Sequence, residues 1–169
     1  MAKKNKKEDV EEVLTKEEQS LKLVKRYMLW TLGAGAIPIP FVDFAAVTGV
    51  QIKMLKDLSE HYDIPFNENA GKSITASLLG GISASTLKAG MLGSFLKAIP
   101  VAGSILGAAS MSLFSAAACY AIGKVFIQHF EAGGTFLDMD PEKVKEYFKE
   151  QFAEGKEVAQ DMADKKSSK

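Results

Sequence analysis

The sequence is poor in the residues that bind metals, form disulfides or act as nucleophiles. Its 169 residues include one cysteine, Cys119, and two histidines, His61 and His129. A lone cysteine cannot form an internal disulfide, and this set offers no zinc-ligand spacing. We therefore expect no metal centre, no cofactor and a reducing, cytoplasmic environment, either in the cytoplasm or at the cytoplasmic face of the inner membrane.

The sequence also has no net charge and no secretory pattern. Lys plus Arg and Asp plus Glu both total 21, so no field of the whole chain attracts nucleic acid or an acidic substrate. Residues 1–19 are highly charged beyond the first few positions, unlike the lead-in to the apolar core of a signal peptide. We expect no nucleic-acid partner and no cleaved signal.

Charge is scarce in the interior of the sequence and concentrated at its two flanks. Residues 27–127 are rich in Ala, Gly and Ser, whereas the flanks are rich in Lys and Glu. The length suits one domain with a substantial core. We predict a disordered basic tip at 1–8, a single helical domain at 9–164 and a disordered tail at 165–169.

No segment alternates apolar and polar residues over a strand length, so we predict no sheet. The fold class is expected to be all-α, with two apolar helical hairpins, proline hinges and amphipathic N- and C-terminal helices. The first helix has capping-box spacing at Thr15 and Glu18, although it could already begin near Val10 and run to Gly35. Pro38 and Pro40 then prevent a helix from running through "AIPIPF".

Four further helices are expected after this first proline hinge. They cover residues 41–62, 68–96 and 101–130, and a fifth starts after Asp140, where Pro141 and Glu142 supply a first-turn proline and an acidic residue. A second hinge, "KAIPVAGS", separates the third helix from the fourth. Its Ala98–Val101 repeats the pattern of Ala36–Ile39, which suggests two hairpins in series.

Small residues recur at every fourth position of the third and fourth expected helices. Such rows let two helix backbones approach closely, so we expect these helices to form a tight antiparallel hairpin. The rows are Ser73, Ser77, Gly81, Ser85, Ala89 and Gly93 in one helix, and Ser104, Ala108, Ser112 and Ala116 in the other.

Motifs that would indicate an enzyme fail on inspection. "AGKS" at residues 70–73 resembles the end of a phosphate-binding loop, but Phe66 stands where that loop needs glycine. Cys119 has no nearby cation to activate it, and the two histidines lie near helix ends without a nucleophile at catalytic spacing. We predict that the protein is not an enzyme.

Asp43 stands alone in a long apolar stretch and has two interpretations. It could be an intramembrane or pocket carboxylate that marks an ion, proton or ligand site. It could instead be a first-turn group of the second helix, where free amide donors and the helix dipole favour negative charge. The first-turn interpretation is favoured.

The apolar interior fits either a bilayer or a soluble bundle. Residues 98–123 carry no charge and exceed the roughly 20 residues that span a membrane. However, Ala, Gly and Ser dominate this stretch, and they gain little from lipid. Both a soluble bundle and hairpins wedged in a bilayer remain open, with membrane association ahead.

Two segments resemble a known family. "PIPFVDFAAVTGVQIKMLKDLSEHYDIPF" and "KAIPVAGSILGAASMSLFSAAACYAIGKVFIQHFEAGGTF" are similar to the two halves of the bacterial YcjF-type, GTPase-associated helical domain of unknown function, over about Trp30 to Phe136. The candidate signature residues are Pro38, Pro40, Asp43, Gln51, Pro100, Gly103 and Gly107, and further matches are Met54, Tyr62, Tyr120, Gly123 and Phe130. The resemblance implies a helical domain, often described as membrane-associated and often fused to a GTPase. With no GTPase domain in this sequence, any nucleotide switch would act in trans.

The leading functional hypothesis is a non-enzymatic adaptor or scaffold at the cytoplasmic membrane face. Its charged outer helices would contact a protein partner, with a GTPase as the candidate. The alternative is a soluble helical bundle that binds a partner protein or a small apolar or amphipathic ligand, in a cavity floored by Asp43 and Gln51.

Overall fold

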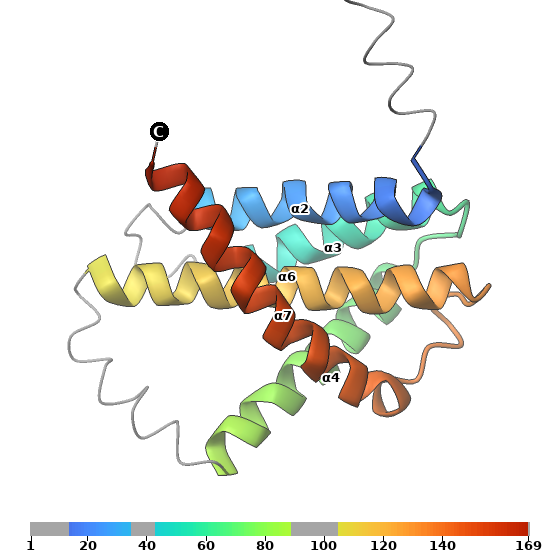
Figure 1. Ribbon diagram of the computed structural model, residues 1–169. Helices are drawn as coiled ribbons and strands as arrows, with labels where there is room; N and C mark the ends of the chain where they lie inside the picture. Colours follow the sequence, from blue (N-terminus) through green and yellow to red (C-terminus); the bar gives the residue numbers. More distant parts are fainter. Residues whose placement is uncertain (1–13, 35–42, 89–104, 169) are drawn as a thin grey trace, which may run out of the picture.

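The computed structural model describes residues 14–34, 43–88 and 105–168, with side chains described at 14–33, 48–82 and 112–168. Every regular element in these ranges is a helix: α2 (Lys16–Ala34), α3 (Asp43–His61), α4 (Glu68–Lys88), α6 (Ile105–Glu131) and α7 (Pro141–Ser167). The all-α prediction is therefore confirmed (Figure 1). Both proline hinges lie outside the described residues, as do residues 1–13 and with them a helix start near Val10.

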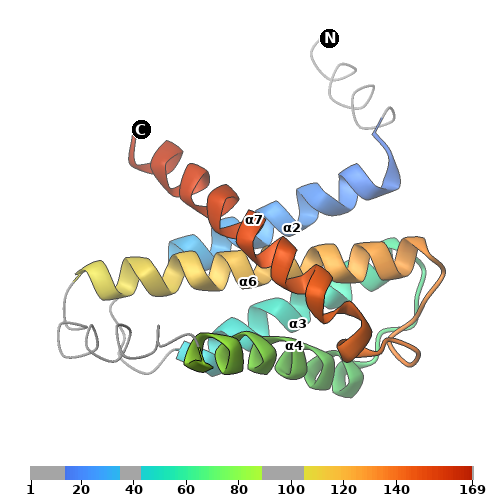
Figure 2. The ribbon, with the colours of Figure 1, turned by 60° about the horizontal axis from the view of Figure 1, so that its bottom comes forward.

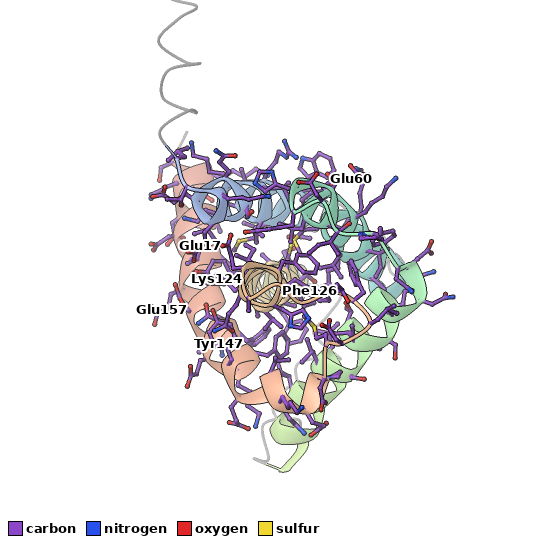
Figure 3. All side chains as sticks on the ribbon, turned by 90° about the vertical axis from the view of Figure 1, so that its right-hand side faces the viewer. Glu17, Glu60, Lys124, Phe126, Tyr147 and Glu157 are labelled. Atoms are coloured by element: carbon purple, nitrogen blue, oxygen red, sulfur yellow. The ribbon has the colours of Figure 1, made fainter. Side chains whose placement is uncertain are left out.

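Helix α6 occupies the centre of the fold. Viewed end-on in Figure 3, it is surrounded by α2, α3, α4 and α7. Its side chains from Ser115 to Gly123 are all buried. Within the described residues, the segment Ser112–Glu131 is the one helical stretch long and apolar enough to cross a membrane, and 72% of it is buried inside the fold. The core helix of a soluble bundle has the same composition, so this feature alone does not indicate a membrane span.

Helix α2 begins with the predicted capping box. The backbone N–H of Thr15 donates to Glu18 Oε2 at 2.8 Å, and the backbone N–H of Glu18 donates to Thr15 Oγ1 at 3.2 Å. These reciprocal bonds satisfy two amide groups that have no partner within the helix. The helix start is thus fixed by local chemistry, at the position that the sequence predicts.

Helices α4 and α7 also begin where their capping residues predict. The Asn67 side chain accepts a hydrogen bond from the backbone N–H of Ala70 at 3.0 Å. Asp140 accepts one from the backbone N–H of Glu142 at 3.1 Å, with Pro141 in the first turn of α7. A proline suits this place because its missing N–H would have no partner there.

The apolar faces predicted from helical periodicity form the core. The buried residues of α2 include Val24 and Met28, and those of α7 include Phe148 and Phe152. In α3 the apolar stripe is buried while the Lys-rich side is exposed. The buried members of the α3 stripe are Ile52, Leu55 and Leu58.

Two glycines allow α6 to lie very close to its neighbours. A methyl group on Gly123 of α6 would lie 2.5 Å from Val24 Cγ2 of α2. A methyl group on Gly155 of α7 would lie 2.8 Å from the backbone oxygen of Ala117 in α6. Since real side chains do not approach so closely, any larger residue at these positions must displace a helix.

The structure differs from the predicted packing of the small-residue rows. Ser112 and Ala116 of α6 are buried as expected, but Ser73 and Ser77 of α4 are exposed. Helix α6 packs far more extensively on α7 and α2 than on α4. The tight pairing of α6 therefore involves α2 and α7, whose own sequences carry larger residues, because single glycines are enough for close contact.

Helix α7 runs from Pro141 to Ser167. It crosses the bundle obliquely, as Figures 1 and 2 show. A methyl group on Gly33, near the end of α2, would lie 3.5 Å from Lys166 Nζ. The last turns of α7 thus lie beside the end of α2.

Candidate functional site

The predicted signature residues are dispersed over the described and undescribed parts of the chain. Pro38, Pro40, Pro100 and Gly103 lie outside the described residues. Asp43 is the first residue of α3 and Gly107 lies near the start of α6, although their surroundings are not described. Asp43 thus lies in the first turn of α3, and its role stays a prediction.

Gln51 is the signature residue whose environment is best defined. It is completely buried in α3, and neither Nε2 nor Oε1 has a hydrogen-bond partner. Thr75 Oγ1 of α4 is likewise buried without a partner. An unpaired amide in an apolar environment costs free energy, so Gln51 is a source of local instability or a group that meets a partner absent from the isolated chain.

Within the described residues, two adjacent large apolar side chains are exposed in the second half of α2. Leu29 is 47% exposed and Trp30 is 51% exposed, and we call these two side chains the Leu29–Trp30 patch. Helix α2 ends on the side of the bundle where α6 begins (Figures 1 and 2). The patch therefore lies toward the C-terminal end of α2.

Beside the patch, a small polar network joins α2 to α3. The Tyr27 hydroxyl donates to Asp57, whose carboxylate lies 3.4 Å from Lys53 Nζ and 4.0 Å from an Arg26 nitrogen. The Tyr27 ring also makes an edge contact with the Trp30 indole, at a centroid distance of 5.0 Å. Burial, with the Asp57 hydrogen bond, raises the pKa of Tyr27. This network fixes the base of the patch while its apolar groups stay exposed.

A second polar cluster joins α2, α3 and α6 at the opposite end of the bundle. The Tyr62 hydroxyl donates to Glu131 Oε1 at 2.6 Å and lies 3.1 Å from the Ser20 hydroxyl. Lys16 Nζ lies 5.1 Å from the centre of the Tyr62 ring. These contacts connect three helices through one side chain, which indicates a structural role.

The Tyr62 cluster predicts a loss of stability at alkaline pH. Burial, followed by the hydrogen bond to Glu131, raises the pKa of Tyr62 to about 12, whereas an unfolded tyrosine titrates near pH ~10. The native state therefore holds this proton more tightly. The contribution of Tyr62 to the free energy of unfolding is complete below about pH 10 and is lost as the pH rises to about 12.

A Tyr62→Phe variant should lose less stability over this pH interval than the parent chain does. Urea denaturation followed by circular dichroism, repeated across the interval, measures the difference. Equal pH slopes for the two proteins would contradict the assignment to Tyr62.

A cavity of about 200 Å³ opens between α2, α6 and α7. Figure 3 shows Glu17, Lys124 and Tyr147 converging on it from these three helices. Lys124 Nζ lies 3.8 Å from Glu17 Oε1, and Glu131 also lines the cavity. Its volume is below the roughly 300–1,000 Å³ of typical ligand pockets, and its cation already faces carboxylates of the same chain. We do not assign a ligand to it.

The two histidines and the cysteine lie in surroundings that suit a structural role. His61 ends α3 and His129 lies in the last turn of α6, as predicted. His129 Nε2 lies 2.9 Å from the Thr135 carbonyl oxygen and 3.2 Å from Asp138 Oδ1, which ties down the following loop. Cys119 is fully buried, and burial raises the pKa of its thiol to about 12. Within the described ranges, no three His, Cys, Asp or Glu side chains are grouped to hold a metal ion.

The sequence analysis does not predict the exposure of Trp30. Residues 27–36 form an uncharged, mostly apolar stretch, although the helical pattern contains a usable signal. At 100° per residue, Trp30 lies 200° from Met28 and 240° from Val24, so it faces away from the buried side of α2. A tryptophan on the side of a helix opposite its buried face is a candidate for contact with a membrane or a partner.

Two comparisons with known proteins give matches. The model of the family described as Domain of unknown function (DUF697) matches residues 2–157. The chain is also 37% identical over 137 residues to Magnetosome membrane protein 22 of Magnetospirillum gryphiswaldense. That alignment covers 81% of this chain and 70% of the relative. No solved structure matches.

Proposed function

We propose a membrane-associated role for this chain, which belongs to the family of the domain of unknown function DUF697. In this proposal it is a non-enzymatic helical adaptor or scaffold at the cytoplasmic membrane face. The observation that carries the proposal is an exposed leucine and tryptophan in the second half of α2, on a bundle whose most apolar helix is already enclosed. Tryptophan is enriched at membrane–water interfaces, where its ring meets both lipid and water.

The relative and the sequence of the hinges support the same role. The relative's name describes it as a magnetosome membrane protein. In the present chain, residues 35–42 carry no charge, and residues 89–104 carry a single one, Lys97. In the sequence, residues 35–42 directly follow α2, the helix that carries the Leu29–Trp30 patch, and residues 89–104 precede α6. An uncharged sequence thus follows the helix that exposes Leu29 and Trp30.

Because the other helices enclose α6, we favour binding of the protein at the membrane surface over a membrane-spanning α6. Its apolar segment is 72% buried by the other helices, and exposing it to lipid would require their separation. A folded bundle that contacts the bilayer through the Leu29–Trp30 patch keeps this core intact. We therefore propose peripheral association.

The outer face of α7 is the candidate surface for a protein partner. It carries acidic and basic residues in alternation, including Glu146 and Lys149 at 2.8 Å. The resemblance to GTPase-associated domains makes a GTPase acting in trans the candidate partner. In this arrangement, the adaptor would hold the GTPase near the membrane.

Fractionation of cells that express the chain tests the membrane part of the proposal. We expect the protein in the membrane fraction, with release by high salt or by alkaline carbonate. Recovery entirely in the soluble fraction without detergent, as a monodisperse species, would contradict membrane association. Resistance to both extractions would contradict peripheral binding and would favour embedded hairpins.

A second candidate function is favoured by the unpaired amide of Gln51. A small apolar or amphipathic ligand with one polar group could satisfy this amide inside a soluble bundle. In this hypothesis Asp43 lines the ligand cavity together with Gln51. An Asp43→Ala variant would then lose ligand binding as well as a modest amount of stability.

A Gln51→Leu variant tests whether the amide serves a ligand. If Gln51 has no partner in the cell, replacing it with an apolar residue of similar volume should raise the free energy of unfolding by about 1 kcal/mol. Urea denaturation of the purified variant gives this value. If lipids or other small molecules that copurify with the parent chain are lost from the variant, the ligand-binding candidate gains support. A fall in stability without such a loss would contradict both interpretations.

A further inference from the structure

The outer face of α2 changes from basic to apolar along the helix. Its exposed residues from the second turn onward are Lys22, Lys25, Arg26, Leu29 and Trp30. At 100° per residue these five side chains lie within an arc of about 140°. The fully buried side chains of the same helix lie opposite: Ser20, Val24, Tyr27 and Met28. We call the five exposed side chains the basic–aromatic face.

Little negative charge opposes this face. Helix α2 has no acidic residue after Glu18. The nearest acid of α3, Asp57, lies 4.0 Å from an Arg26 nitrogen, but it also accepts the Tyr27 hydrogen bond and lies 3.4 Å from Lys53 Nζ. Glu60 lies 3.8 Å from Lys56 Nζ on the same helix. Among the described residues, no ion pair neutralises Lys22 or Lys25, so the face keeps a positive charge.

No other described surface combines these features. The large apolar side chains that are exposed in the described ranges are Leu29, Trp30 and Leu137. Leu137 stands alone in the α6–α7 loop, next to Asp138. The outer side of α7 carries many charges, but carboxylates lie beside its lysines, as at Lys145 and Glu142. Adjacent cations and exposed apolar groups therefore occur together on α2.

We infer that the basic–aromatic face binds the headgroup region of an anionic bilayer. This inference rests on the proposed membrane role and adds its surface and its lipid class. Lys22, Lys25 and Arg26 contact lipid phosphates, while Leu29 and Trp30 enter the boundary with the acyl chains. Two adjacent apolar side chains are too few for the roughly 800 Å² that each partner buries in a stable protein interface. Two such side chains suit a lipid surface, because lipids can rearrange around a small inserted apolar group.

The three cations should give the binding a strong preference for anionic lipid. Each Lys or Arg close to such a surface contributes about 1 kcal/mol. Three of them correspond to a preference on the order of 100-fold, at 1.4 kcal/mol per tenfold. Added salt should reduce the preference, because exposed charges are screened.

Trp30 is the one tryptophan of the chain, so its fluorescence reports on this face directly. The test mixes the full chain with vesicles of phosphatidylcholine alone, or of equal parts phosphatidylcholine and phosphatidylglycerol. We expect the emission of Trp30 to shift to shorter wavelength with the mixed vesicles, and the protein to float with them. With phosphatidylcholine alone, apparent affinity should be on the order of 100-fold weaker.

Matched charge variants distinguish this face from the charge of the whole chain. Lys22→Gln, Lys25→Gln and Arg26→Gln together should abolish the preference for anionic vesicles, with an unchanged far-UV circular dichroism spectrum. The control replaces Lys143, Lys149 and Lys156 of α7 with Gln, which removes the same charge elsewhere and should leave binding intact. Equal losses in the two variants would overturn the inference.

The remaining outcomes separate the inference from the proposed function. Equal binding to both vesicle types, with a full shift of Trp30 emission, would overturn the anionic-lipid inference and leave membrane association standing. Binding to anionic vesicles without any shift of Trp30 would place the contact on another surface, which also overturns the inference. No binding to either vesicle type would contradict both.

Discussion

A Phe126→Ala variant is expected to lose about 3–5 kcal/mol of unfolding free energy. Phe126 is fully buried in α6, and its ring lies 5.6 Å from that of Phe130 and 5.3 Å from that of Phe136. Truncation leaves a cavity in an aromatic cluster that joins α6 to the following loop. Urea denaturation followed by far-UV circular dichroism measures the loss.

Leu137→Ala provides the matched control, because Leu137 is 80% exposed and lies in the same loop as Phe136. Its substitution should change stability by no more than about 0.5 kcal/mol. If Phe126→Ala cost no more than Leu137→Ala, α6 would not be the central helix of the folded chain in water.

A Gly123→Ala variant should be destabilised by about 1–3 kcal/mol, although alanine is the better helix former. The new methyl group would lie 2.5 Å from Val24 Cγ2. Val24 is fully buried, and its β-branched side chain is stiff at χ1. Helices α2 and α6 must therefore separate. Thermal or urea denaturation gives the difference.

Gly80→Ala is the control for this variant, since Gly80 lies in α4 and a methyl group there would meet nothing within 4 Å. The control should gain about 0.5–1 kcal/mol from helix propensity alone. Similar changes in both variants would show that α2 and α6 do not approach as closely as the structure describes.

The helix starts could be predicted because their signals are local. Free amide groups are satisfied within a few residues by Thr15 with Glu18, by Asn67 and by Asp140. Such chemistry does not depend on the rest of the fold. Periodicity also identified the buried faces, because a core face repeats along a helix whatever its partner is.

The choice of helix partners could not be predicted in the same way. The small rows predicted a tight contact between α4 and α6, yet Ser73 and Ser77 are exposed. A row of small residues permits close packing without selecting the partner. The close contacts occur instead at Gly123 and Gly155, and either glycine by itself is an unremarkable sequence feature.

The candidate site was predictable only in part. Gln51 was identified from the resemblance, but its lack of hydrogen-bond partners depends on packing around α3. Trp30 was read as part of an apolar stretch, because hydrophobicity alone does not tell an enclosed side chain from an exposed one. The cations of α2 indicate a lipid-binding face only when the structure shows that they are exposed beside Trp30.

Depth-resolved quenching of Trp30 by brominated lipids tests the central claim, that the folded bundle binds an anionic membrane surface through α2. Bromine can be attached to the acyl chain close to the headgroup or close to the bilayer centre. We predict strong quenching by the shallow bromines and little by the deep ones, since a bundle on the surface places its indole at the boundary. Stronger quenching by the deep bromines, or none by either, would contradict this account.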